Sequence, residues 1–480
     1  MNIVMIASEA NPIYKTGGLA DVIYALSKQF VTLGHNVSVI LPYYKQVGKL
    51  DLLKDASPVF KMTIKMNWRV FDSEVYNKEI DGIEYFFISN DRYFDRPNYY
   101  GYYDDGERFA FFSNAAIELI KLLPYKVDIV HVHDWQPGMI PCLLKVKHKD
   151  EPAYKNIKTV LTIHNPLFKG YFNQSSLWDL YDLPIWLYEK GDVQFENQVS
   201  TLKAGIHFAD KITTVSPTHA FELTTPEGSK GLWYEMVLRK DDFIGILNGM
   251  DYGEFNPSKD KLIYKEYNEK DCLEGKEANK IAFCKEHGLN PQQPLFAVVS
   301  RLTNQKGLDL MFAMADFVSN NGGTFAVLGS GEKYAEDYFN TMIRRNPKHA
   351  YVYIGYNDEI AHKLYASSDF FIMPSAFEPC GLGQMIAQRY GSLPIVRRTG
   401  GLKDSVNCFD IENRNEDKAD GFGFDNYNII DAIGSCARAM TVYSDKATLK
   451  KLVINAMKKD NTWSKSAAKY LEVYQSMLKK

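Results

Sequence analysis

Short apolar runs alternate with amphipathic segments along both halves of the chain. In the first half the runs cover residues 3–7, 37–41, 85–88, 127–132, 160–163 and 212–215. In the second half they cover residues 295–300, 325–328, 352–354, 370–373 and 393–396. Runs of this kind, separated by helical periodicity, are typical of strands in a parallel sheet. The pattern therefore predicts an α/β fold with helices on both faces of each sheet.

The alternation breaks near residues 244–251, and the segment 251–293 is charged and weakly patterned. A strand, a turn containing Lys-Gly and a helix then follow at residues 295–318, in the same order as at residues 3–30. This restart predicts a second doubly wound domain.

We place the first domain at residues 1–247 and the second at residues 248–460. Residues 461–480 are predicted to form a C-terminal helix that packs back on the first domain, with Trp463 as its anchor. Ligands of doubly wound sheets bind beyond the carboxyl ends of the strands. Two such domains are expected to face each other across a deep cleft that holds the ligand.

Composition narrows the classes of function. The 480 residues are 45% hydrophobic and 24% charged, with a formal net charge of -3, which argues against binding nucleic acid through bulk positive charge. No apolar stretch approaches the roughly 20 residues that span a bilayer. The six cysteines are scattered without a CxxC pair, and the first residues, which have no basic region and reach Glu9 early, do not predict a signal peptide. We expect a cytoplasmic protein with reduced thiols that binds neither nucleic acid nor membrane.

The turn after the first predicted strand has the features of a phosphate site. It reads Lys-Thr-Gly-Gly-Leu-Ala-Asp at residues 15–21 and leads into a helix. The N–H groups at a helix start attract anions, glycines allow close approach, and Lys15 adds a positive charge. The spacing matches neither the dinucleotide fingerprint nor the P-loop, and a plain strand-to-helix turn remains the alternative.

A second cationic turn follows the strand at residues 295–300 and contains Arg301 and Lys306. Arginine and lysine together suit a pyrophosphate, although two solvated loop charges would look the same in sequence. With Lys15 from the other domain, three cations are expected to converge on one diphosphate. Lys15 and Lys306 both lie on turns predicted to be exposed, so removing either is expected to leave folding intact.

A carboxylate and a glycine turn follow the strand at residues 370–373. The segment reads Pro-Ser-Ala-Phe-Glu-Pro-Cys-Gly-Leu-Gly-Gln at residues 374–384. Glu378 is suited to sugar hydroxyls, and the N–H groups of Gly381, Leu382 and Gly383 to a phosphate. Cys380 lies in the same turn and is counted with the substrate-binding residues.

Two histidine segments follow strands in the first half: residues 131–136, His-Val-His-Asp-Trp-Gln, and residues 162–165, Thr-Ile-His-Asn. Alternate strand residues share a face, so His-x-His-Asp admits a metal site, but no further cluster has matching ligand spacing. A carbohydrate site fits better. Asp134 and His164 would bind hydroxyls, Asn165 would lie beside them, and Trp135 would stack or pack nearby.

Taken together, these segments resemble the bacterial glycogen synthases and plant starch synthases nearly from end to end. The resemblance is carried by residues 15–21, 106–112, 133–135, 162–165, 214–217, 247–251, 300–307, 378–382 and 399–402. It implies a GT-B fold, two Rossmann-like domains across a cleft. The implied reaction transfers glucose from ADP-glucose to the non-reducing end of an α-1,4-glucan, glycogen or a maltooligosaccharide, with retention and without a metal or other cofactor.

The resemblance also implies roles for single residues. Lys15, Arg301 and Lys306 would hold the diphosphate, with backbone N–H groups of Gly18 and of Leu382 and Gly383. Asp21 would lie near the ribose or the sugar, and Tyr356 near the adenine. Glu378 would bind glucose hydroxyls, while His164 and Asp134 would lie at the reacting carbon. His164, Glu378, Asp134, Lys306 and Arg301 form the predicted catalytic set.

The chain departs from the usual family pattern at three positions. Gln136 and Gly383 replace the common His and Thr or Ser, and His219 replaces a common Tyr. Neither of the first two changes removes a charge, whereas His219 makes the acceptor surface there harder to assign.

Four other functions compare with this interpretation as follows. A UDP-glucose-dependent or sucrose-type transferase on the same fold differs in base contacts that the sequence does not reveal. An α-glucan phosphorylase needs a Schiff-base lysine and a longer chain. A non-catalytic glucan-binding protein need not keep Lys15, Arg301, Lys306 and Glu378 together. A Rossmann dehydrogenase is disfavoured because neither half contains GxGxxG.

Overall fold

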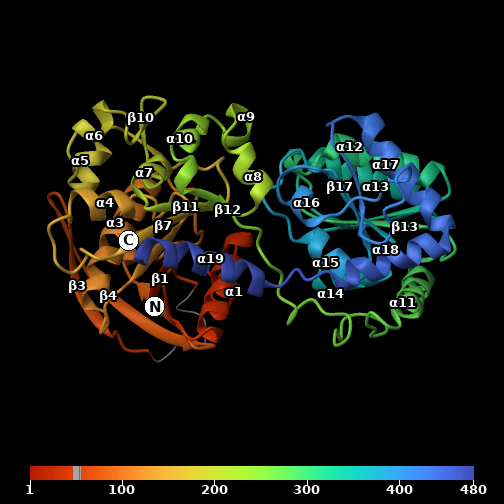
Figure 1. The fold of residues 1–480 in the computed structure, drawn as a ribbon, viewed down its shortest axis with the longest axis horizontal. Coiled ribbons are helices and arrows are strands. Elements are labelled where there is room, and N and C mark those ends of the chain that lie inside the picture. The colour runs from red at the N-terminus through yellow and green to blue at the C-terminus, as the bar shows by residue number, and fades with distance from the viewer. Residues whose placement is uncertain (47–52, 54–55, 480) are drawn as a thin grey trace. The chain divides into compact units, whose positions relative to one another are not determined.

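The chain forms two compact units, seen in a computed structural model that describes residues 1–46, 53 and 56–479 (Figure 1). The first unit comprises Met1–Val215, Ala220–Asn248 and Trp463–Lys480, and the second comprises Ser216–His219 and Gly249–Thr462. The main change of unit falls after Asn248. Unlike the predicted division, the structure groups the short segment Ser216–His219 with the second unit, so helix α8 (Pro217–Glu222) begins there.

The first unit is built on a nine-stranded sheet with the order β12-β11-β7-β6-β1-β2-β5-β4-β3. Its strands are β1 (Asn2–Ile6), β2 (Asn36–Pro42), β3 (Phe60–Met66), β4 (Arg69–Ile80), β5 (Ile83–Ile88), β6 (Ile129–His133), β7 (Lys158–Ile163), β11 (Lys211–Thr214) and β12 (Phe243–Gly245). The strands from β11 to β5 pair in parallel, as predicted. Strand β12, where the sequence pattern predicted no strand, also pairs in parallel with β11. Strands β8 (Tyr171–Phe172), β9 (Gln194–Phe195) and β10 (Gln198–Ser200) form a separate small sheet.

The prediction of a wholly parallel sheet is wrong at one edge, where β4 pairs antiparallel with both β5 and β3. Along β3 buried and exposed side chains alternate, because only one face of this hairpin is covered. Continuous apolar runs are typical of strands that are buried on both faces. This hairpin has an alternating pattern instead, so it was not predicted.

Helices cover the first sheet. They are α1 (Gly18–Thr32), α2 (Asp91–Phe94), α3 (Asp105–Leu122), α4 (Ile140–Val146), α5 (Ser176–Tyr181), α6 (Trp186–Glu189), α7 (Thr201–Phe208), α9 (Pro226–Ser229), α10 (Trp233–Leu238) and α19 (Trp463–Leu478). The C-terminal helix α19 packs on α1, and both chain ends lie in this unit (Figure 1). Its Trp463 is only 5% exposed, and Tyr474 contacts Phe30 with ring centroids 5.5 Å apart.

The second unit holds a six-stranded, fully parallel sheet with the order β15-β14-β13-β16-β17-β18. Its strands are β13 (Leu295–Val299), β14 (Thr324–Gly329), β15 (Ala350–Ile354), β16 (Phe370–Met373), β17 (Leu393–Arg397) and β18 (Phe422–Phe424). Its helices are α11 (Cys272–His287), α12 (Leu308–Asn320), α13 (Lys333–Arg345), α14 (Asp358–Ser367), α15 (Gly383–Arg389), α16 (Gly400–Ser405), α17 (Ile429–Ser444) and α18 (Lys446–Lys458). Apart from the three-residue β18, all its strands were predicted from apolar runs.

Helix α11 lies inside the segment 251–293, where the sequence shows little pattern. The helix was not predicted because its buried side is partly polar and gives no apolar periodicity. Lys276, Asn279 and Lys280 are all buried. Lys276 Nζ donates to the carbonyls of Ala366 and Tyr390, at 3.1 and 3.0 Å, and burial lowers its pKa to about 7. Those carbonyls lie at the C-terminal ends of α14 and α15, where the helix dipole favours a positive charge.

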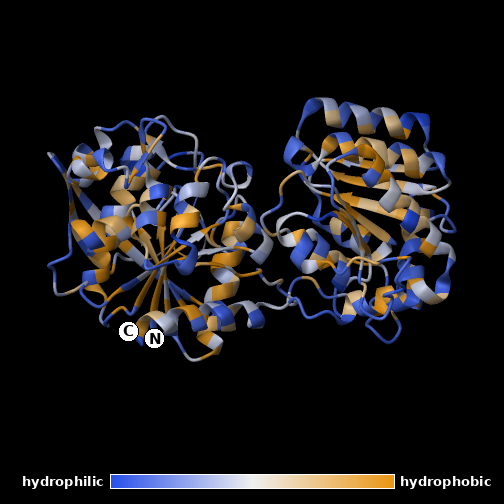
Figure 2. Cartoon of the chain, turned by 45° about the horizontal axis from the view of Figure 1, so that its top comes forward, coloured by the Kyte–Doolittle hydropathy of each residue, from blue (hydrophilic) through white to orange (hydrophobic). Residues whose placement is uncertain are grey.

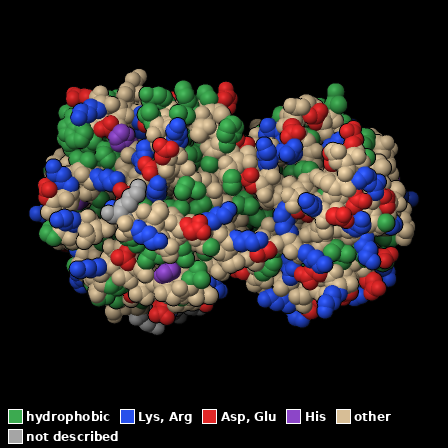
Figure 3. All heavy atoms as spheres, viewed as in Figure 1, with side chains coloured by type: hydrophobic (Ala, Val, Ile, Leu, Met, Phe, Trp, Pro, Cys, Tyr) green, Lys and Arg blue, Asp and Glu red, His purple; other side chains and the backbone are tan. Residues whose placement is uncertain are grey.

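Hydropathy follows the layers in each unit. The sheet strands are the most hydrophobic elements, and the outer helices and loops carry the polar residues (Figure 2). On the face shown in Figure 3, basic and acidic side chains are interspersed over each unit. Among the described residues, no helix combines the length and the apolar character needed to cross a bilayer.

A buried cluster of polar and charged side chains ties the segment after Asn248 to helix α14 and to the end of helix α15. Asp260 accepts hydrogen bonds from His362 at 2.7 Å and from the Tyr390 hydroxyl at 2.5 Å. Burial by itself lowers the pKa of His362, but the hydrogen bond and charge of Asp260 raise it above its ordinary 6.5. The stabilisation from protonated His362 is therefore complete below about pH 6.5 and is lost as the pH rises through the raised pKa.

We expect Asp260→Asn to destabilise the second unit by about 2 kcal/mol near pH 6, because it removes one partner of a buried charged pair. Thermal unfolding of the full chain, followed at about pH 6 and pH 8.5, should show a difference from wild type that shrinks at the higher pH. A difference that is equal at both values would contradict a role for the His362 charge. Asp241→Asn, at an exposed position in the first unit, serves as the control.

Candidate active site

In the first unit, three of the predicted site segments follow the carboxyl ends of three neighbouring strands. Strands β7, β6 and β1 are adjacent and parallel, and their carboxyl ends lead to His164, Asp134 and the Lys15 turn. Sequence reasoning placed each segment after a strand. The sheet order, which sequence did not show, makes them neighbours.

The Lys15 turn leads into helix α1, which begins at Gly18. Lys15 Nζ forms an ion pair with Asp21 Oδ2 at 2.7 Å, and about half of its side chain is exposed. A Cβ on Gly18 would meet no atom within 4 Å, and the residue does not need a positive φ. Neither backbone conformation nor packing therefore requires glycine there, which leaves open space directly above the helix start.

Glu9 shapes this turn, and sequence reasoning missed it. Its carboxylate accepts from the Thr16 backbone N–H at 2.5 Å and from the Thr16 hydroxyl at 2.7 Å. Burial raises the pKa of Glu9, and the hydrogen bonds from Thr16 partly oppose that rise. A buried acid directly after the first strand was the signal in the sequence, because such a carboxylate must find donors close by.

Asp134 adopts an unusual backbone conformation with φ of 60°, which is rare for a residue other than glycine. Its carboxylate accepts from the backbone N–H groups of His164 at 2.7 Å and Asn165 at 3.4 Å. Burial raises the pKa of Asp134 to about 7, and these two bonds oppose the rise. The carboxyl group thus joins the ends of β6 and β7 and titrates near neutrality.

The histidines of the two segments form a connected group. His133 Nδ1 lies 3.0 Å from His164 Nε2, and His131 bonds to the hydroxyls of Thr162 at 2.6 Å and Tyr474 at 2.7 Å. Burial lowers the pKa of both His131 and His164 to about 3. Burial also lowers the pKa of His133 well below its ordinary 6.5, so all three rings are neutral at physiological pH. In the described part of the chain, no three His, Cys, Asp or Glu side chains are grouped as metal ligands.

Trp135 packs inside the first unit. Its ring lies edge-on to Phe109 at 5.1 Å and next to Phe172 at 5.8 Å, and the residue is half-buried. Of the two roles expected for Trp135, the structure shows packing behind the Asp134 turn.

In the second unit, Lys306 and Glu378 meet at the centre of the sheet. Strand β13 leads to Lys306 and β16 to Glu378, and these adjacent strands mark the point where the strand order reverses. Lys306 Nζ lies 2.6 Å from Glu378 Oε2, and the Ser375 hydroxyl donates to the same oxygen at 3.0 Å. Ligands of doubly wound sheets bind at this reversal of strand order.

The expectation that Lys306 lies on an exposed turn is wrong. Only 16% of its side chain and 8% of that of Glu378 are accessible, so each is the main charged partner of the other. Gly307 follows with φ of 73°, and a Cβ there would lie 2.2 Å from the Pro374 carbonyl oxygen. This close approach brings the two loops together. Arg301, at the start of the same loop, is exposed.

The glycine turn after Glu378 is held from beneath by Gln384. Its amide nitrogen donates to the carbonyls of Cys380 and Gly381, both at 3.1 Å, and to the Ser405 hydroxyl at 2.9 Å. Gly381 has φ of 74°, which favours glycine. Leu382 and Gly383 follow at the start of α15, where N–H groups lack intrahelical partners.

Tyr356 follows β15, the strand at one edge of the second sheet. It is 79% exposed, and its hydroxyl donates to Asp358 at 3.0 Å. Its ring is thus accessible to a planar ligand.

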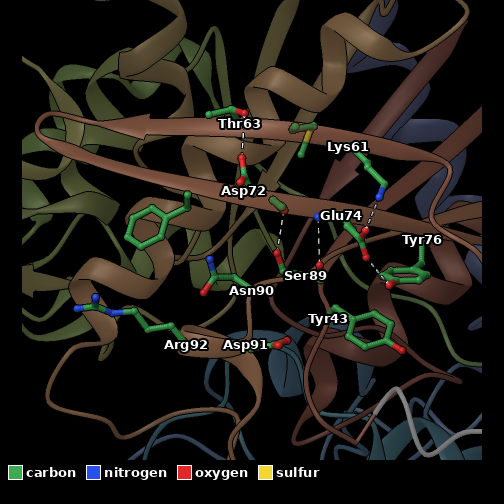
Figure 4. A pocket seen from close by; sticks show the side chains of 13 residues that line it. Tyr43, Lys61, Thr63, Asp72, Glu74, Tyr76, Ser89, Asn90, Asp91 and Arg92 are labelled. Carbon is green, nitrogen blue, oxygen red and sulfur yellow. Dashed lines mark hydrogen bonds and ion pairs between the residues drawn. The ribbon is translucent and has the colours of Figure 1, made fainter.

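A separate hollow of about 780 Å³ lies on the antiparallel edge of the first unit (Figure 4). It is lined by Tyr43, Lys61, Met62, Thr63, Phe71, Asp72, Ser73, Glu74, Tyr76, Ser89, Asn90, Asp91 and Arg92. Its charged and polar groups bond mainly to one another, for example Lys61 with Glu74 at 3.0 Å and Thr63 with Asp72 at 3.1 Å. None of the predicted site residues lines it.

Comparison with known proteins gives the same assignment in both halves. Residues 2–240 match the family described as starch synthase catalytic domain, and residues 279–458 match glycosyl transferases group 1. Glycogen synthase of Clostridium perfringens is 42% identical, over 100% of this chain and 99% of its own. Glycogen synthase of Bacillus anthracis is 41% identical over 100% of both chains.

Solved structures agree. The catalytic domain of starch synthase IV from Arabidopsis thaliana, bound to ADP and acarbose, superposes with a TM-score of 0.89 at 33% identity, covering 100% of this chain and 99% of that one. Sucrose-phosphate synthase from Thermosynechococcus elongatus shares the fold alone, with a TM-score of 0.61 at 15% identity over 100% and 99% of the two chains. The chain thus has the two-domain GT-B fold and belongs to the glycogen and starch synthase family of glycosyltransferases.

Proposed function

We propose that the protein transfers glucose from ADP-glucose to the non-reducing end of an α-1,4-glucan, with retention of configuration and release of ADP. The observation that carries this is the contact between Lys306 and Glu378 at the strand reversal of the second sheet, at 2.6 Å. A nucleoside diphosphate sugar has a diphosphate next to a polyhydroxyl ring. A cation and a carboxylate at contact distance match that pair of groups.

The leaving diphosphate gains negative charge in the transition state. Lys306, Arg301 and Lys15 would stabilise that charge, with N–H groups of Gly18, Gly381, Leu382 and Gly383 as further donors and Cys380 in the same turn. Such interactions accelerate the reaction because they are stronger in the transition state than in the ground state. Binding would also require Lys15 to exchange part of its contact with Asp21, which is proposed to turn to the ribose or the sugar.

The glucosyl carbon gains positive charge as the bond to ADP breaks. The carboxylate of Asp134 is proposed to face that charge, and neutral His164 and Asn165 to bind sugar hydroxyls. Two backbone N–H groups donate to the Asp134 carboxylate. These bonds orient the carboxylate and hold it in place, which disfavours its attack on the glucosyl carbon as a nucleophile. We therefore propose same-face attack, in which the departing phosphate accepts the proton of the acceptor hydroxyl.

The choice of nucleotide depends on the group that covers the base. Tyr356 is proposed to cover the adenine, and its exposed ring together with the ADP bound to the starch synthase IV structure supports that choice. UDP-glucose is the alternative donor. Incubating the purified protein with glycogen and either donor, and measuring the nucleotide released, separates the two. Release of UDP in preference to ADP would overturn the donor assignment, and release of neither would overturn the proposed reaction.

We further propose a cytoplasmic location, where the donor and the glucan would both be available. The six cysteines are all free thiols, five of them buried, as is usual where thiols stay reduced. Neither nucleic acid nor a membrane is proposed as a partner.

Activity is expected to survive EDTA. The side chains of Lys15, Arg301 and Lys306 supply the positive charge that a divalent ion would otherwise bring to a diphosphate. Released ADP should be measured directly by chromatography, so that no magnesium-dependent coupling enzyme enters the assay. A divalent ion bound stoichiometrically to the purified protein, whose removal abolishes turnover, would overturn this expectation.

A further inference from the structure

His133 lies behind the predicted site and touches its catalytic histidine. It ends strand β6, is fully buried, and its Nδ1 lies 3.0 Å from Nε2 of His164. The two ring centroids are 5.3 Å apart. The backbone N–H of His164 also donates to Asp134 at 2.7 Å, so both its main chain and its ring are held by the last residue of β6 and the one after it.

Only one proton occupies the bond between these two rings. Burial lowers the pKa of both histidines far below the physiological range, so each is neutral with one N–H and one lone pair. Either His133 donates through Nδ1–H, or His164 donates through Nε2–H. The two arrangements leave different atoms of His133 without a partner.

The other nitrogen of His133 decides between them. Its Nε2 is buried and has no hydrogen-bond partner in the described part of the chain. If His133 accepted from His164, its own proton would sit on this Nε2 as a buried, unpaired N–H. Among buried backbone groups an unpaired N–H is rarer than an under-satisfied acceptor, and we apply the same preference to the ring nitrogens. The favoured arrangement is therefore His133 Nδ1–H donating to His164 Nε2.

The ring of His133 packs against the ring of His131. His131 lies two residues earlier on the same face of β6, with ring centroids 4.1 Å apart. Both nitrogens of His131 are engaged, one by the Thr162 hydroxyl and the other by Tyr474 of the C-terminal helix α19. Helix α19 thus fixes the layer of rings on which His133 rests.

We infer that His133 is a positioning residue that holds His164 in the tautomer with its proton on Nδ1. His164 then presents an N–H, rather than a lone pair, to the substrate. This rests on the proposed function only for the identity of the acceptor, a hydroxyl oxygen of the donor glucose. The tautomer itself follows from the geometry of the two rings.

The test compares wild type with three variants by ¹⁵N NMR of the histidine-labelled full chain and by steady-state kinetics. His133→Phe keeps a buried ring and removes the donor, whereas His133→Asn places an amide N–H near the position of Nδ1. His207→Phe, on a partly exposed side chain of α7, is the matched control. If His133→Phe does not fold, the wild-type spectrum by itself still decides the tautomer of His164.

We expect His164 to carry its proton on Nδ1 in wild type and in His133→Asn, and to populate the other tautomer in His133→Phe. The phenylalanine variant should lose about 10- to 100-fold in kcat, the asparagine variant should recover much of it, and KM for the donor should change little because His133 is not a ligand of the substrate. A proton on Nε2 of His164 in wild type, or an unchanged tautomer in His133→Phe, would overturn the inference. An expected set of spectra without ADP-glucose turnover would instead overturn the proposed function alone.

Discussion

Replacing Lys306 by alanine is expected to lower kcat/KM for glucosyl transfer by roughly 30- to 1,000-fold, equivalent to about 2–4 kcal/mol of transition-state stabilisation. The ammonium lies at the strand reversal, 2.6 Å from Glu378, where a diphosphate and a sugar ring would meet. Because the negative charge on the diphosphate grows as ADP leaves, the loss should fall on kcat as well as on KM.

The same substitution should also destabilise the second unit, by about 3 kcal/mol, because it leaves the buried Glu378 carboxylate without its cation. Lys15→Ala is the matched variant: about half of the Lys15 side chain is exposed, so its loss should reduce transfer without a comparable loss of stability. Thermal unfolding measured beside the kinetics separates the two effects.

Lys306→Ala/Glu378→Gln provides the control for stability. Removing both charges should restore much of the unfolding temperature while activity stays low, since an unpaired buried charge is the main cause of the instability. Wild-type turnover in folded Lys306→Ala would contradict the assignment of Lys306 to the active site. If Lys306→Ala were as stable as wild type, the Lys306–Glu378 contact would contribute nothing to the stability of the protein.

Asp134→Asn is expected to lower kcat by roughly 100- to 1,000-fold while the protein stays folded. Asparagine tolerates the left-handed backbone conformation at φ 60° and can still accept from His164 and Asn165 through its Oδ1. What it lacks is the negative charge opposite the developing positive charge on the glucosyl carbon. Asp134→Leu, which also strains the backbone and loses both hydrogen bonds, should in contrast fold poorly.

The pH dependence distinguishes this charge effect from a structural one. Burial raises the pKa of Asp134 to about 7 from an ordinary 3.8, so wild-type activity should fall on the acid side of pH 7. The residual activity of Asp134→Asn should lack that acid limb. In the interval between the two pKa values the folded protein binds the extra proton, so the contribution of this group to stability decreases as the pH rises. Wild type should therefore lose stability relative to Asp134→Asn between about pH 4 and pH 8.

Agreement between the pH profiles of the two proteins would contradict a catalytic charge on Asp134. A profile with an acid limb in both would assign the titration to another group. Melting curves recorded in the same buffers check that each rate comes from folded protein.

Sequence alone was sufficient wherever a segment's character depends on its neighbours along the chain. Continuous apolar runs located the strands that are buried on both faces, and β16 was placed to the residue. The restart after residue 293 separated the two sheets, and Trp463 was found buried as the anchor of α19. Each charged or glycine-rich motif was assigned to the end of a strand, because the strand before it and the helix after it are both visible in the pattern.

Tertiary structure decided what depends on segments far apart in sequence. The β3–β4 hairpin was missed because one of its faces is solvated, and α11 because its buried side uses lysine and asparagine. The burial of Lys306 followed from strand order, which brings the loops after β13 and β16 together although 72 residues separate the two charges. Tyr474 lies 343 residues from His131 and yet holds its ring. The apolar pattern shows which face of a segment is buried, but hydrogen bonds and ion pairs between distant segments depend on the order of strands in the sheet, and no local pattern records that order.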